Sequence, residues 1–379
     1  MTAHPDTDTD LRHMRAALTL AARGLGRTWP NPAVGCVLVR DGAVIGRGWT
    51  QPGGRPHAET EALARARSLS GGAEGATAYV TLEPCNHYGR TPPCALALVE
   101  AKVARVVVAC QDPDPRVAGG GLTRLRDVGI EVVTGVCEAE ALALNEGFFN
   151  RITLGRPLVT LKVASTLDGR IATATGESQW ITGPTARAWG HRLRAGHDAI
   201  LVGIGTALAD DPELTCRLPG LEDRSPVRVV LDSSLRLPPT AKLATGAGRI
   251  PTWVVTGPSP DPARAAALTA LGVEVIPVAG ANGQVDPAAA MAALASRGIT
   301  RVLVEGGASI AGALLGAGLV DRLEWFRAAS LIGGDGLPAV AGFGVEALAA
   351  VARFERTAVR SAGVDLAESY RRIPGKASV

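Results

Sequence analysis

The sequence lacks a charge excess of either sign, since 39 basic and 36 acidic residues leave a net charge of +3 over 379 residues. Aromatic residues are also scarce, at 4%, and they do not gather with basic residues. Both features disfavour a nucleic-acid partner, which is commonly bound through basic and aromatic clusters. The apolar runs fall well short of the ~20 residues that span a bilayer. The first ten residues have no apolar core typical of a secretion signal, so we expect a cytoplasmic protein that does not bind membranes.

Cysteine is scarce as well, with six in the chain. Without a secretion signal we do not expect these cysteines to form a disulfide framework. Only Cys85 and Cys94 lie in a cluster with histidine. Glycine and proline are frequent by contrast, at 46 and 25 residues. They follow no Gly-X-Y period, which excludes a collagen-like chain, and no repeat of fixed period is present.

The chain length predicts two domains, or three at most, at roughly 100–200 residues per domain. Strand and helix patterns alternate in both halves, which indicates layered α/β folds. An Asp41-Gly42 turn between two apolar segments predicts a β-hairpin. We expect a first domain over 1–150, a short helix within 138–155 followed by a break at 155–157, and a second domain over 156–379. The second domain is expected to interleave strands at 197–203, 227–231, 252–256, 273–277 and 301–304 with helices at 184–194, 262–271, 287–296 and 309–316.

Histidine and cysteine form a metal-binding pattern in the first half. His57 lies in a Pro-His-Ala-Glu segment at a helix start, Cys85 follows a predicted strand, and Cys94 comes nine residues later. One neutral imidazole and two thiolates suit Zn²⁺ and leave the fourth tetrahedral position open, as in catalytic zinc sites. Zinc lowers the pKa of a bound water to about 7 and so supplies hydroxide near neutral pH. Glu59, in the first helical turn, is the candidate for carrying protons to the leaving group.

This pattern is typical of the zinc-dependent base deaminases, in which hydroxide attacks a ring carbon and ammonia leaves. The gap between the two cysteines is longer than in their usual Pro-Cys-x-x-Cys segment. Two alternatives to a catalytic zinc site stay open. Two buried cysteines could lie near an unrelated histidine by chance, or the zinc site could be closed and structural, with His87 as its fourth ligand. The open coordination position and Glu59 argue against the structural site.

Three segments together resemble the deaminase domain of the bifunctional riboflavin-biosynthesis deaminase–reductase family: Thr28 to Cys36, His57 to Glu59, and Glu83 to Cys94. The long gap between the cysteines separates this family from cytidine and tRNA-adenosine deaminases. The resemblance implies a cytidine-deaminase-like three-layer domain. It also implies that Asn31 helps to hold the pyrimidine and that Arg90 reaches the ribose phosphate, which a guanidinium fork suits. The alternative for Asn31 is a turn residue between prolines.

The second half lacks the Gly-x-Gly-x-x-Gly segment of Rossmann dehydrogenases, which disfavours that fold. It contains Glu305-Gly306-Gly307 between a strand and a helix, where backbone amides suit a pyrophosphate, although a tight turn explains the glycines equally well. The second half resembles the C-terminal domain of the same family, a reductase with a dihydrofolate-reductase-like fold that uses NADPH. The segments that carry this resemblance occur in the same order: 159–169, 178–182, 194–198, 200–217 and 304–310.

The resemblance implies a set of site residues in the second domain. NADPH is expected to contact Ala164, Trp180, Thr206, Asp210, Ser233, Gly307, Ala308, Ser309, Ile310, Ala311, Gly312 and Ala313. The substrate is expected to be held by Ser178, Arg194, Leu214, Arg217 and Glu305. Two arginines of this set can pair with a phosphate bidentately. Lys162 either assists opening of the ribose ring, orients Asp168, or is a solvated strand lysine.

One departure from the family is visible, because segment 327–330 lacks the proline that usually follows this strand. We expect an altered loop near the cofactor and retained activity. The last 40 residues carry no motif to which we assign a role.

The resemblance implies an enzyme with two steps and two cofactors, Zn²⁺ and NADPH. The first domain would remove the 2-amino group of a diamino-ribosylamino-pyrimidinone 5′-phosphate, and the second would reduce the ribosyl side chain to ribityl. We expect a homo-oligomer that acts on this small ribotide. One alternative is a deaminase of bases in RNA, whose binding would depend steeply on salt. Another is a zinc-stapled interaction protein with a degenerate nucleotide-binding domain.

Overall fold

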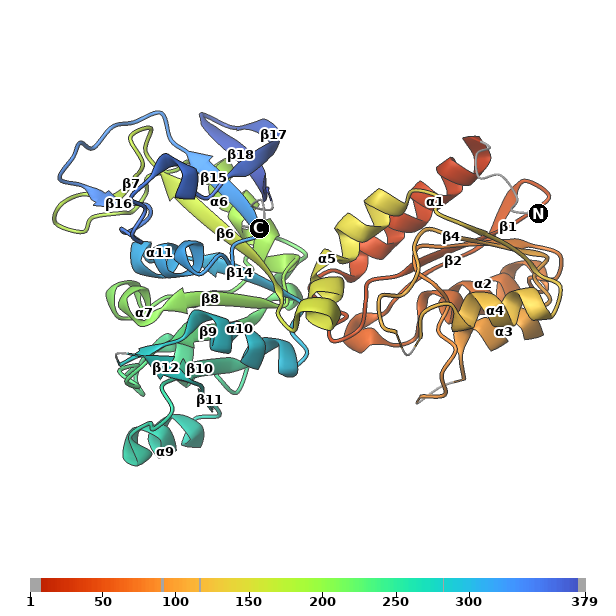
Figure 1. Ribbon diagram of the computed structural model, residues 1–379, viewed down its shortest axis with the longest axis horizontal. Helices are drawn as coiled ribbons and strands as arrows, with labels where there is room; N and C mark the ends of the chain where they lie inside the picture. The colour runs from red at the N-terminus through yellow and green to blue at the C-terminus, as the bar shows by residue number, and fades with distance from the viewer. Residues whose placement is uncertain (1–7, 90–91, 116, 282, 374–379) are drawn as a thin grey trace. The chain divides into compact units, whose positions relative to one another are not determined.

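A computed structural model of the chain describes residues 8–89, 92–115, 117–281 and 283–373. The chain divides into two compact units between Gly155 and Arg156. The first unit is coloured red to yellow in Figure 1 and the second yellow-green to blue. Within the described ranges no helix is both long and apolar enough to cross a membrane.

The first unit has three layers around one mixed sheet of order β2-β1-β3-β4-β5. The predicted hairpin is confirmed: β1 and β2 are antiparallel, and the turn residues Asp41 and Gly42 both have positive φ, as a two-residue hairpin turn requires. β3, β4 and β5 run parallel. Helices α1 and α5 cover one face and α2, α3 and α4 the other (Figure 1), so the predicted three-layer arrangement is confirmed. The elements are α1 (Asp8–Ala21), β1 (Gly35–Arg40), β2 (Ala43–Trp49), α2 (Ala58–Ser70), β3 (Thr77–Val80), α3 (Cys94–Glu100), β4 (Arg105–Val108), α4 (Gly120–Asp127), β5 (Glu131–Thr134) and α5 (Glu138–Leu154).

Glycines in the hairpin let helices approach the sheet closely on both faces. A Cβ at Gly35 would lie 1.9 Å from the Ala17 carbonyl oxygen of α1, and a Cβ at Gly48 would lie 2.1 Å from the Ala58 carbonyl oxygen of α2. No larger residue fits at either position without moving a helix. The contact at Ala58 fixes the first turn of α2, which follows directly after His57.

The second unit is built on a nine-stranded sheet of order β11-β10-β9-β8-β14-β6-β15-β18-β17. The strands from β11 to β15 are parallel, whereas β18 and β17 are antiparallel. Every residue of β8, β9 and β10 is buried, as expected for parallel strands covered on both faces. The strands of this sheet are β6 (Leu158–Ser165), β8 (Ala199–Gly203), β9 (Val227–Leu231), β10 (Thr252–Thr256), β11 (Glu274–Pro277), β14 (Arg301–Glu305), β15 (Arg322–Arg327), β17 (Phe354–Ala362) and β18 (Asp365–Arg372).

Six α-helices, two short 3-10 helices (Glu222–Arg224 and Leu348–Ala350) and two small ribbons complete the described part of this unit. The helices are α6 (Pro184–Ala195), α7 (Ile204–Asp210), α8 (Lys242–Thr245), α9 (Pro262–Ala270), α10 (Pro287–Ser296) and α11 (Ala308–Gly316). The ribbons pair β7 (Arg170–Ala172) with β16 (Leu337–Pro338), and β12 (Gly280–Ala281) with β13 (Gln284–Val285). The predicted alternation of strands and helices is confirmed.

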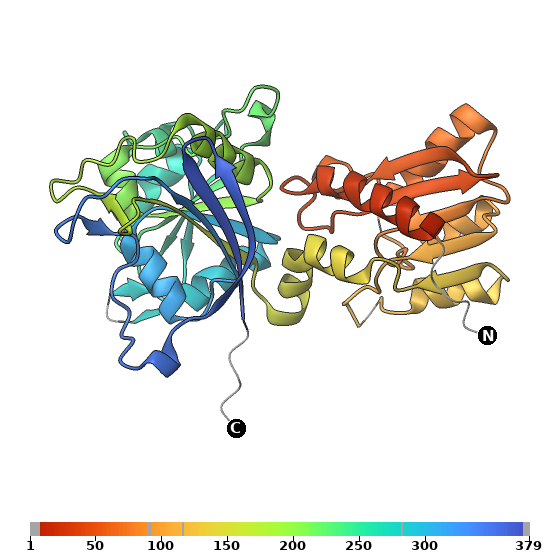
Figure 2. The same cartoon turned by 90° about the horizontal axis from the view of Figure 1, so that it is seen from above.

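The structure differs from the sequence-based expectation at one element, and it shows a hairpin in a region for which no expectation was made. The helix expected to be short, α5, has 17 residues and is the longest among the described ones. The C-terminal region, to which no role was assigned, forms the long hairpin of β17 and β18 that extends the sheet beyond β15 (Figure 2). Most residues of β17 are exposed, so this strand gives no apolar signal.

Candidate functional site

The first candidate site is centred on the start of α2. His57 is the N-cap residue of this helix and has extended backbone angles, with φ −72° and ψ 160°. Glu59 lies in the first helical turn. Because His57 precedes the helical backbone, its ring is not bound to the helical spacing that separates residues i and i+2. The position expected for His57, at the start of a helix, is confirmed.

His57, Cys85 and Cys94 come together although they lie on three separate segments. The His57 Nδ1 atom is 3.3 Å from the Cys94 Sγ atom and 3.7 Å from the Cys85 Sγ atom. All three ligand atoms lie within 4.8 Å of one another. Tetrahedral zinc with its usual bond lengths separates such ligands by roughly 3.5–3.8 Å, so the donor set and spacing fit this metal. His87 is not in this group, and among the described residues no fourth protein ligand joins it.

The protonation states of the cluster follow from burial and hydrogen bonding. Hydrogen bonds from the Cys94 thiol and from His57 lower the pKa of Cys85 to about 4, which favours the thiolate that binds metal. Glu59 is only 3% exposed. Burial, and next the negative charge of Cys85, raise the pKa of Glu59 to about 7. A carboxyl group with this pKa can both accept and release a proton near neutral pH.

A residue that sequence reasoning missed anchors the segment of Cys85. The buried carboxylate of Glu83 accepts hydrogen bonds from the backbone amides of Gly119 and Gly121, both at 3.0 Å, and longer ones from Asp112 and Leu122. Two of these amides belong to the first turn of α4, where a carboxylate also meets the favourable helix dipole. Glu83 therefore ties the segment of Cys85 to the start of α4. Its only sequence signal is its position two residues before a metal ligand.

The two substrate residues expected in this unit have different outcomes. The Asn31 side-chain amide donates to the Gly54 carbonyl oxygen at 3.1 Å. A Cβ at Gly54 would lie 2.0 Å from the same amide nitrogen, so Asn31 packs against the loop that leads to His57. Arg90 lies outside the described residues, and its expected role stays a prediction.

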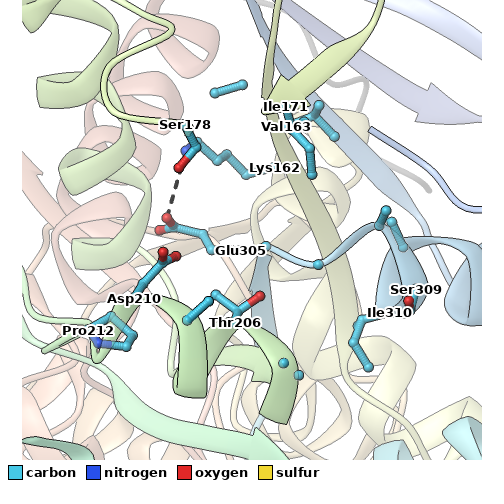
Figure 3. A pocket seen from close by; sticks show the side chains of 18 of the residues that line it. Lys162, Val163, Ile171, Ser178, Thr206, Asp210, Pro212, Glu305, Ser309 and Ile310 are labelled. Carbon is cyan, nitrogen blue, oxygen red and sulfur yellow. Dashed lines mark ion pairs between the residues drawn. The ribbon is translucent and has the colours of Figure 1, made fainter. Parts of the chain in front are cut away.

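The second candidate site is a cavity of about 1620 Å³ in the second unit (Figure 3). It lies along the carboxyl ends of β6, β8, β9 and β14, where ligands of parallel sheets commonly bind. The structure brings nearly all the residues expected here to its wall: Lys162, Ala164, Ser178, Trp180, Arg194, Thr206, Asp210, Leu214, Arg217, Ser233, Glu305, Gly307, Ala308, Ser309, Ile310, Ala311 and Ala313.

Gly312 is the exception, because it does not line the cavity. A Cβ at this position would lie 2.8 Å from the Ala341 carbonyl oxygen. Gly312 therefore allows the loop after β16 to approach α11 closely, which is a packing role.

The turn between β14 and α11 forms a cradle in this cavity. Gly306 and Gly307 have φ values of 97° and 88°, which side chains rarely adopt. A Cβ at Gly306 would also lie 3.1 Å from the Thr206 side chain of α7. Both the conformation and the space thus require glycine. The backbone of this turn can approach a pyrophosphate at the start of α11, so the residues present fit a dinucleotide.

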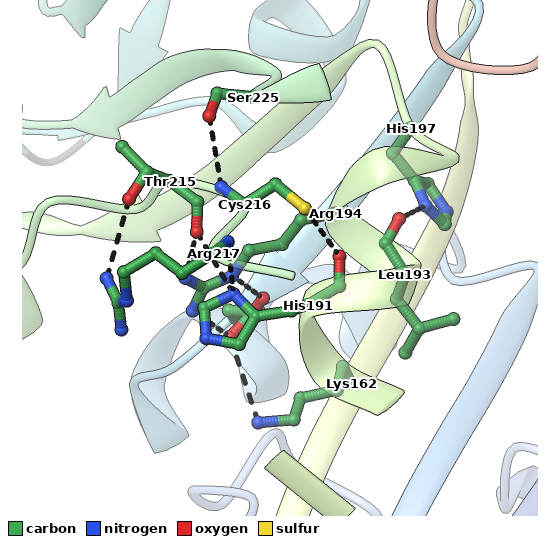
Figure 4. A network of polar contacts seen from close by, with 10 residues as sticks. Lys162, His191, Leu193, Arg194, His197, Thr215, Cys216, Arg217 and Ser225 are labelled. Atoms are coloured by element: carbon green, nitrogen blue, oxygen red, sulfur yellow. Dashed lines mark hydrogen bonds and ion pairs between the residues drawn. The ribbon is translucent and has the colours of Figure 1, made fainter. Parts of the chain in front are cut away.

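A buried ion-pair network lies in the same cavity (Figure 4). The Arg194 guanidinium binds both carboxylate oxygens of Glu305, at 2.7 and 2.9 Å, and also donates to the Thr215 carbonyl oxygen. The Lys162 Nζ atom lies 3.7 Å from Glu305. Burial by itself would raise the pKa of Glu305, but Arg194 and Lys162 hold it at about 2.

This network changes one expectation. Arg194 and Arg217 were expected to pair with a phosphate together, but the fork of Arg194 is already engaged by Glu305. The Arg217 guanidinium is half-exposed, and among the described residues its contacts are long ones, with Glu213 and Thr215. Lys162 is not a solvated strand lysine, since its side chain is 21% exposed and faces Glu305. It also does not contact Asp168.

Asp168 instead holds the loop after β15. Its carboxylate accepts hydrogen bonds from the Gly333 amide at 2.7 Å, from the Ile332 amide at 3.3 Å, and from the Thr166 hydroxyl at 2.6 Å. The hydrogen bonds from Thr166 and Gly333 lower the pKa of Asp168 to about 2. The segment without the expected proline is tied to β6 by the Ala328 amide, which donates to the Ser165 carbonyl oxygen at 2.8 Å. The loop after β15 is therefore fastened by hydrogen bonds, and its expected difference from the family stays a prediction.

Comparisons with known proteins agree with this division into two sites. Residues 7–110 match the cytidine and deoxycytidylate deaminase zinc-binding region, and residues 157–367 match the RibD C-terminal domain. The chain is 43% identical over 355 residues to the riboflavin biosynthesis protein RibD of Bacillus amyloliquefaciens, covering 93% of this chain and 94% of that protein. It is 44% identical over 368 residues to the protein of the same name from Escherichia coli, covering 94% and 98%.

Solved structures agree over the same length. RibD of Acinetobacter baumannii has a TM-score of 0.85 at 40% identity and covers 97% of this chain and 99% of its own. A Thermotoga maritima protein described as a diaminohydroxyphosphoribosylaminopyrimidine deaminase/5-amino-6-(5-phosphoribosylamino)uracil reductase has a TM-score of 0.84 at 36% identity, with 96% and 99% covered.

Proposed function

The chain belongs to the bifunctional deaminase–reductase family of riboflavin biosynthesis, and on that premise we propose which residues and which nicotinamide cofactor perform its two reactions. It is an enzyme with a hydrolytic deaminase in the first unit and a reductase in the second. The matches extend over both halves of the chain, so they do not favour the alternatives of an RNA-base deaminase or a zinc-stapled interaction protein.

The first reaction converts 2,5-diamino-6-(5-phosphoribosylamino)pyrimidin-4(3H)-one into 5-amino-6-(5-phosphoribosylamino)uracil. The proposal assigns His57, Cys85 and Cys94 as the zinc ligands. Zinc, when bound there, activates a water for attack on the ring carbon that carries the 2-amino group. Glu59 would carry the two protons of this water in turn, the first to the ring nitrogen beside the attacked carbon and the second to the amino group, which leaves as ammonia. The observation that carries this assignment is the meeting of the three ligand atoms within 4.8 Å beside a buried carboxyl group.

The second reaction reduces the ribosyl side chain to ribityl, giving 5-amino-6-(5-phosphoribitylamino)uracil. The bound nicotinamide supplies the hydride, and the protein supplies orientation and charge. We assign NADPH as the cofactor, with its pyrophosphate at the turn of Gly306 and Gly307. Glu305 and Lys162 lie within the cavity and can bind the sugar hydroxyls that become exposed as the ribose ring opens. Arg217, the less engaged of the two arginines, is assigned to the substrate phosphate.

Mass spectrometry of products formed from the diamino ribotide tests both assignments. The zinc-loaded protein alone should yield only the deaminated ribotide, and addition of NADPH should yield the ribityl product. Deamination without subsequent reduction would contradict the cofactor assignment. No deamination by zinc-loaded protein would contradict the assignment of the first site.

A further inference from the structure

One polar atom at the cavity of the second unit, the Nε2 atom of His191, is not engaged by the protein. On α6, Arg187, His191 and Arg194 follow one another at spacings of four and three residues, so they share one face of the helix. All three line the cavity. Within the described part of the chain, the hydrogen bonds of the His191 ring all involve its Nδ1 atom. The Nε2 atom is reachable by solvent and is therefore available to a ligand.

The Nδ1 atom of His191 lies between two backbone groups (Figure 4). The Arg217 amide nitrogen is 3.2 Å away, and the Thr215 carbonyl oxygen is 3.1 Å away. In a neutral ring, Nδ1 can accept from the amide or donate to the carbonyl, but it cannot do both. The two partners are not equivalent. The Thr215 oxygen already accepts a hydrogen bond from the Arg194 guanidinium at 2.9 Å, whereas among the described contacts Nδ1 is the one acceptor for the Arg217 amide.

This balance of donors and acceptors selects one form of the ring. With Nδ1 as an acceptor, the Arg217 amide and the Arg194 guanidinium each have an acceptor of their own. With the proton on Nδ1, the amide would face a second N–H group. The hydrogen bond at Nδ1 thus assigns the proton to Nε2. Burial, and next the charges of Arg194 and Arg217, lower the pKa of His191, so the ring is neutral near pH 7, as this assignment requires.

The surroundings of His191 indicate which ligand its Nε2–H group meets. The ring contacts the backbone of Thr215 and Arg217, and the Arg217 guanidinium lies 3.4 Å from the Thr215 hydroxyl. The charge of Arg217 also acts on the ring. The glycine turn assigned to the cofactor pyrophosphate packs against Thr206 instead. The donor at Nε2 therefore belongs to the end of the cavity where Arg217 lies, which is the end assigned to the ribotide.

Arg217 alone binds a phosphate weakly at this end of the cavity. Its side chain is 52% exposed, and water weakens the attraction between charges at such a site. The Arg194 guanidinium is engaged by Glu305. A partly buried N–H donor supplies a directional hydrogen bond, which is stronger to a charged phosphate oxygen than to a neutral hydroxyl.

We propose that His191 is a substrate-binding residue of the reductase and donates a hydrogen bond from Nε2 to the 5′-phosphate of the ribotide. The inference rests on the assignment of this phosphate to Arg217 in the proposed function. By accepting from the Arg217 amide, the same ring also holds the backbone that carries the Arg217 side chain. His191 thus acts on the phosphate directly and through Arg217.

Two substitutions separate the roles of the two ring nitrogens. His191→Asn keeps an acceptor near the Nδ1 position but has no group at the Nε2 position, whereas His191→Gln can place an NH2 donor there. Reductase assays on the full-length protein should show a rise of about 10- to 100-fold in KM for the deaminated ribotide in His191→Asn, and of less than about fivefold in His191→Gln. In both variants, kcat and KM for NADPH should change by less than about twofold.

Arg192→Gln is the matched control, because Arg192 is an exposed neighbour on α6 that does not line the cavity. Its KM for the ribotide should equal the wild-type value. Equal increases in His191→Asn and His191→Gln would overturn the role of the Nε2 donor. A rise in KM for NADPH in His191→Asn, with KM for the ribotide unchanged, would also overturn the proposal, because it would assign His191 to the cofactor.

Reduction of the deaminated riboside, the same compound without its 5′-phosphate, separates this inference from the function on which it rests. The wild-type protein should have a higher kcat/KM for the ribotide than for the riboside. His191→Asn should reduce this preference by about 10- to 100-fold and leave the value for the riboside unchanged. A wild-type protein without the preference would contradict the phosphate assignment itself. A preference that falls in Arg217→Gln but persists in His191→Asn would leave that assignment intact and overturn the role of His191.

Discussion

Each unit contains a buried glutamate in its site, and the surroundings of these two residues push their pKa values in opposite directions. Glu59 is 3% exposed and Glu305 is 9% exposed, so both have lost most of their water. Burial, and next the negative charge of the Cys85 thiolate, raise the pKa of Glu59 to about 7. Glu305 lies between Arg194 and Lys162, and its pKa falls to about 2. Similar burial thus gives a carboxyl group that titrates near neutral pH in one unit and a permanent negative charge in the other.

The difference follows from the chemistry of the two reactions. Hydrolytic deamination moves protons between water and the leaving group, so its carboxyl group must change state near neutral pH. Hydride transfer is performed by the cofactor, so the protein there needs fixed charges that orient the sugar. Burial raises the pKa of both carboxyl groups, and only at Glu305 do neighbouring cations reverse that effect.

Among the variants that test this comparison, Glu59→Gln should lower activity the most. The amide cannot carry a proton, and we expect deaminase kcat to fall by about 1000-fold. Zinc content should be unchanged, because Glu59 is not a proposed ligand. Reduction of separately supplied deaminated ribotide should continue at the wild-type rate. A fall of less than tenfold would show that another group carries the proton.

Glu305→Gln should have the next largest effect, in the opposite unit. It removes the negative charge between Arg194 and Lys162 and leaves both cations without their carboxylate. We expect reductase kcat/KM to fall by about 100-fold, with deaminase activity unchanged. Glu274→Gln is the matched control, since Glu274 forms an exposed pair with Arg297 outside the cavity. If both variants lose reductase activity equally, Glu305 has no special role.

How much could be predicted from the sequence differs between the two sites. The metal centre depends on His57, Glu59, Cys85 and Cys94, which lie within 38 residues and carry side chains of distinctive chemistry. Their pattern therefore predicts the site before any fold is known. The alternating α/β elements could also be predicted, because buried parallel strands give continuous apolar segments.

The supporting contacts could not be predicted, because they join residues far apart in the sequence. Arg194 and Glu305 are separated by 111 positions, and nothing local to either one indicates the other. The amides that bind Glu83 come from a loop and a helix about 30 to 40 positions later. The exposed hairpin strand β17 was missed for a different reason, since a strand without an apolar face has no periodic signal.

The stability of the second unit should fall at acid pH because of His197. This residue is fully buried in the second unit, where its two ring nitrogens contact the Leu193 carbonyl oxygen and the Thr160 hydroxyl. Burial, and next the charge of Arg301, lower the pKa of His197 to about 3, against about 6.5 in an unfolded chain. The unfolded state therefore binds the proton more readily, and stability falls as the pH drops from about 6.5 toward 3.

At pH 5 this linkage should destabilise the second unit by about 2 kcal/mol relative to pH 7. Urea unfolding followed by tryptophan fluorescence at both pH values measures the loss. His197→Gln should lower the stability at pH 7 and remove about 2 kcal/mol of the difference between the two pH values. His87→Gln, on an exposed loop of the first unit, serves as the control. If the difference in stability between pH 5 and pH 7 is undiminished in His197→Gln, that difference arises from other titrating groups.

Glu83→Gln should have the smallest effect and tests how the metal centre is held. Glutamine replaces one carboxylate oxygen with an NH2 group, which would face two backbone amides as a further donor, either those of Asp112 and Gly119 or those of Gly121 and Leu122. The segment of Cys85 should loosen, and zinc affinity should fall by about 10-fold, as commonly found for groups that orient metal ligands. Competition with a chromophoric chelator measures this affinity without relying on activity. The exposed Glu100→Gln variant is the control. Unchanged zinc affinity in Glu83→Gln would mean that α2 and α3 alone set the geometry of the ligands. The first unit, unlike the second, would then need no distant contact to hold its charged centre.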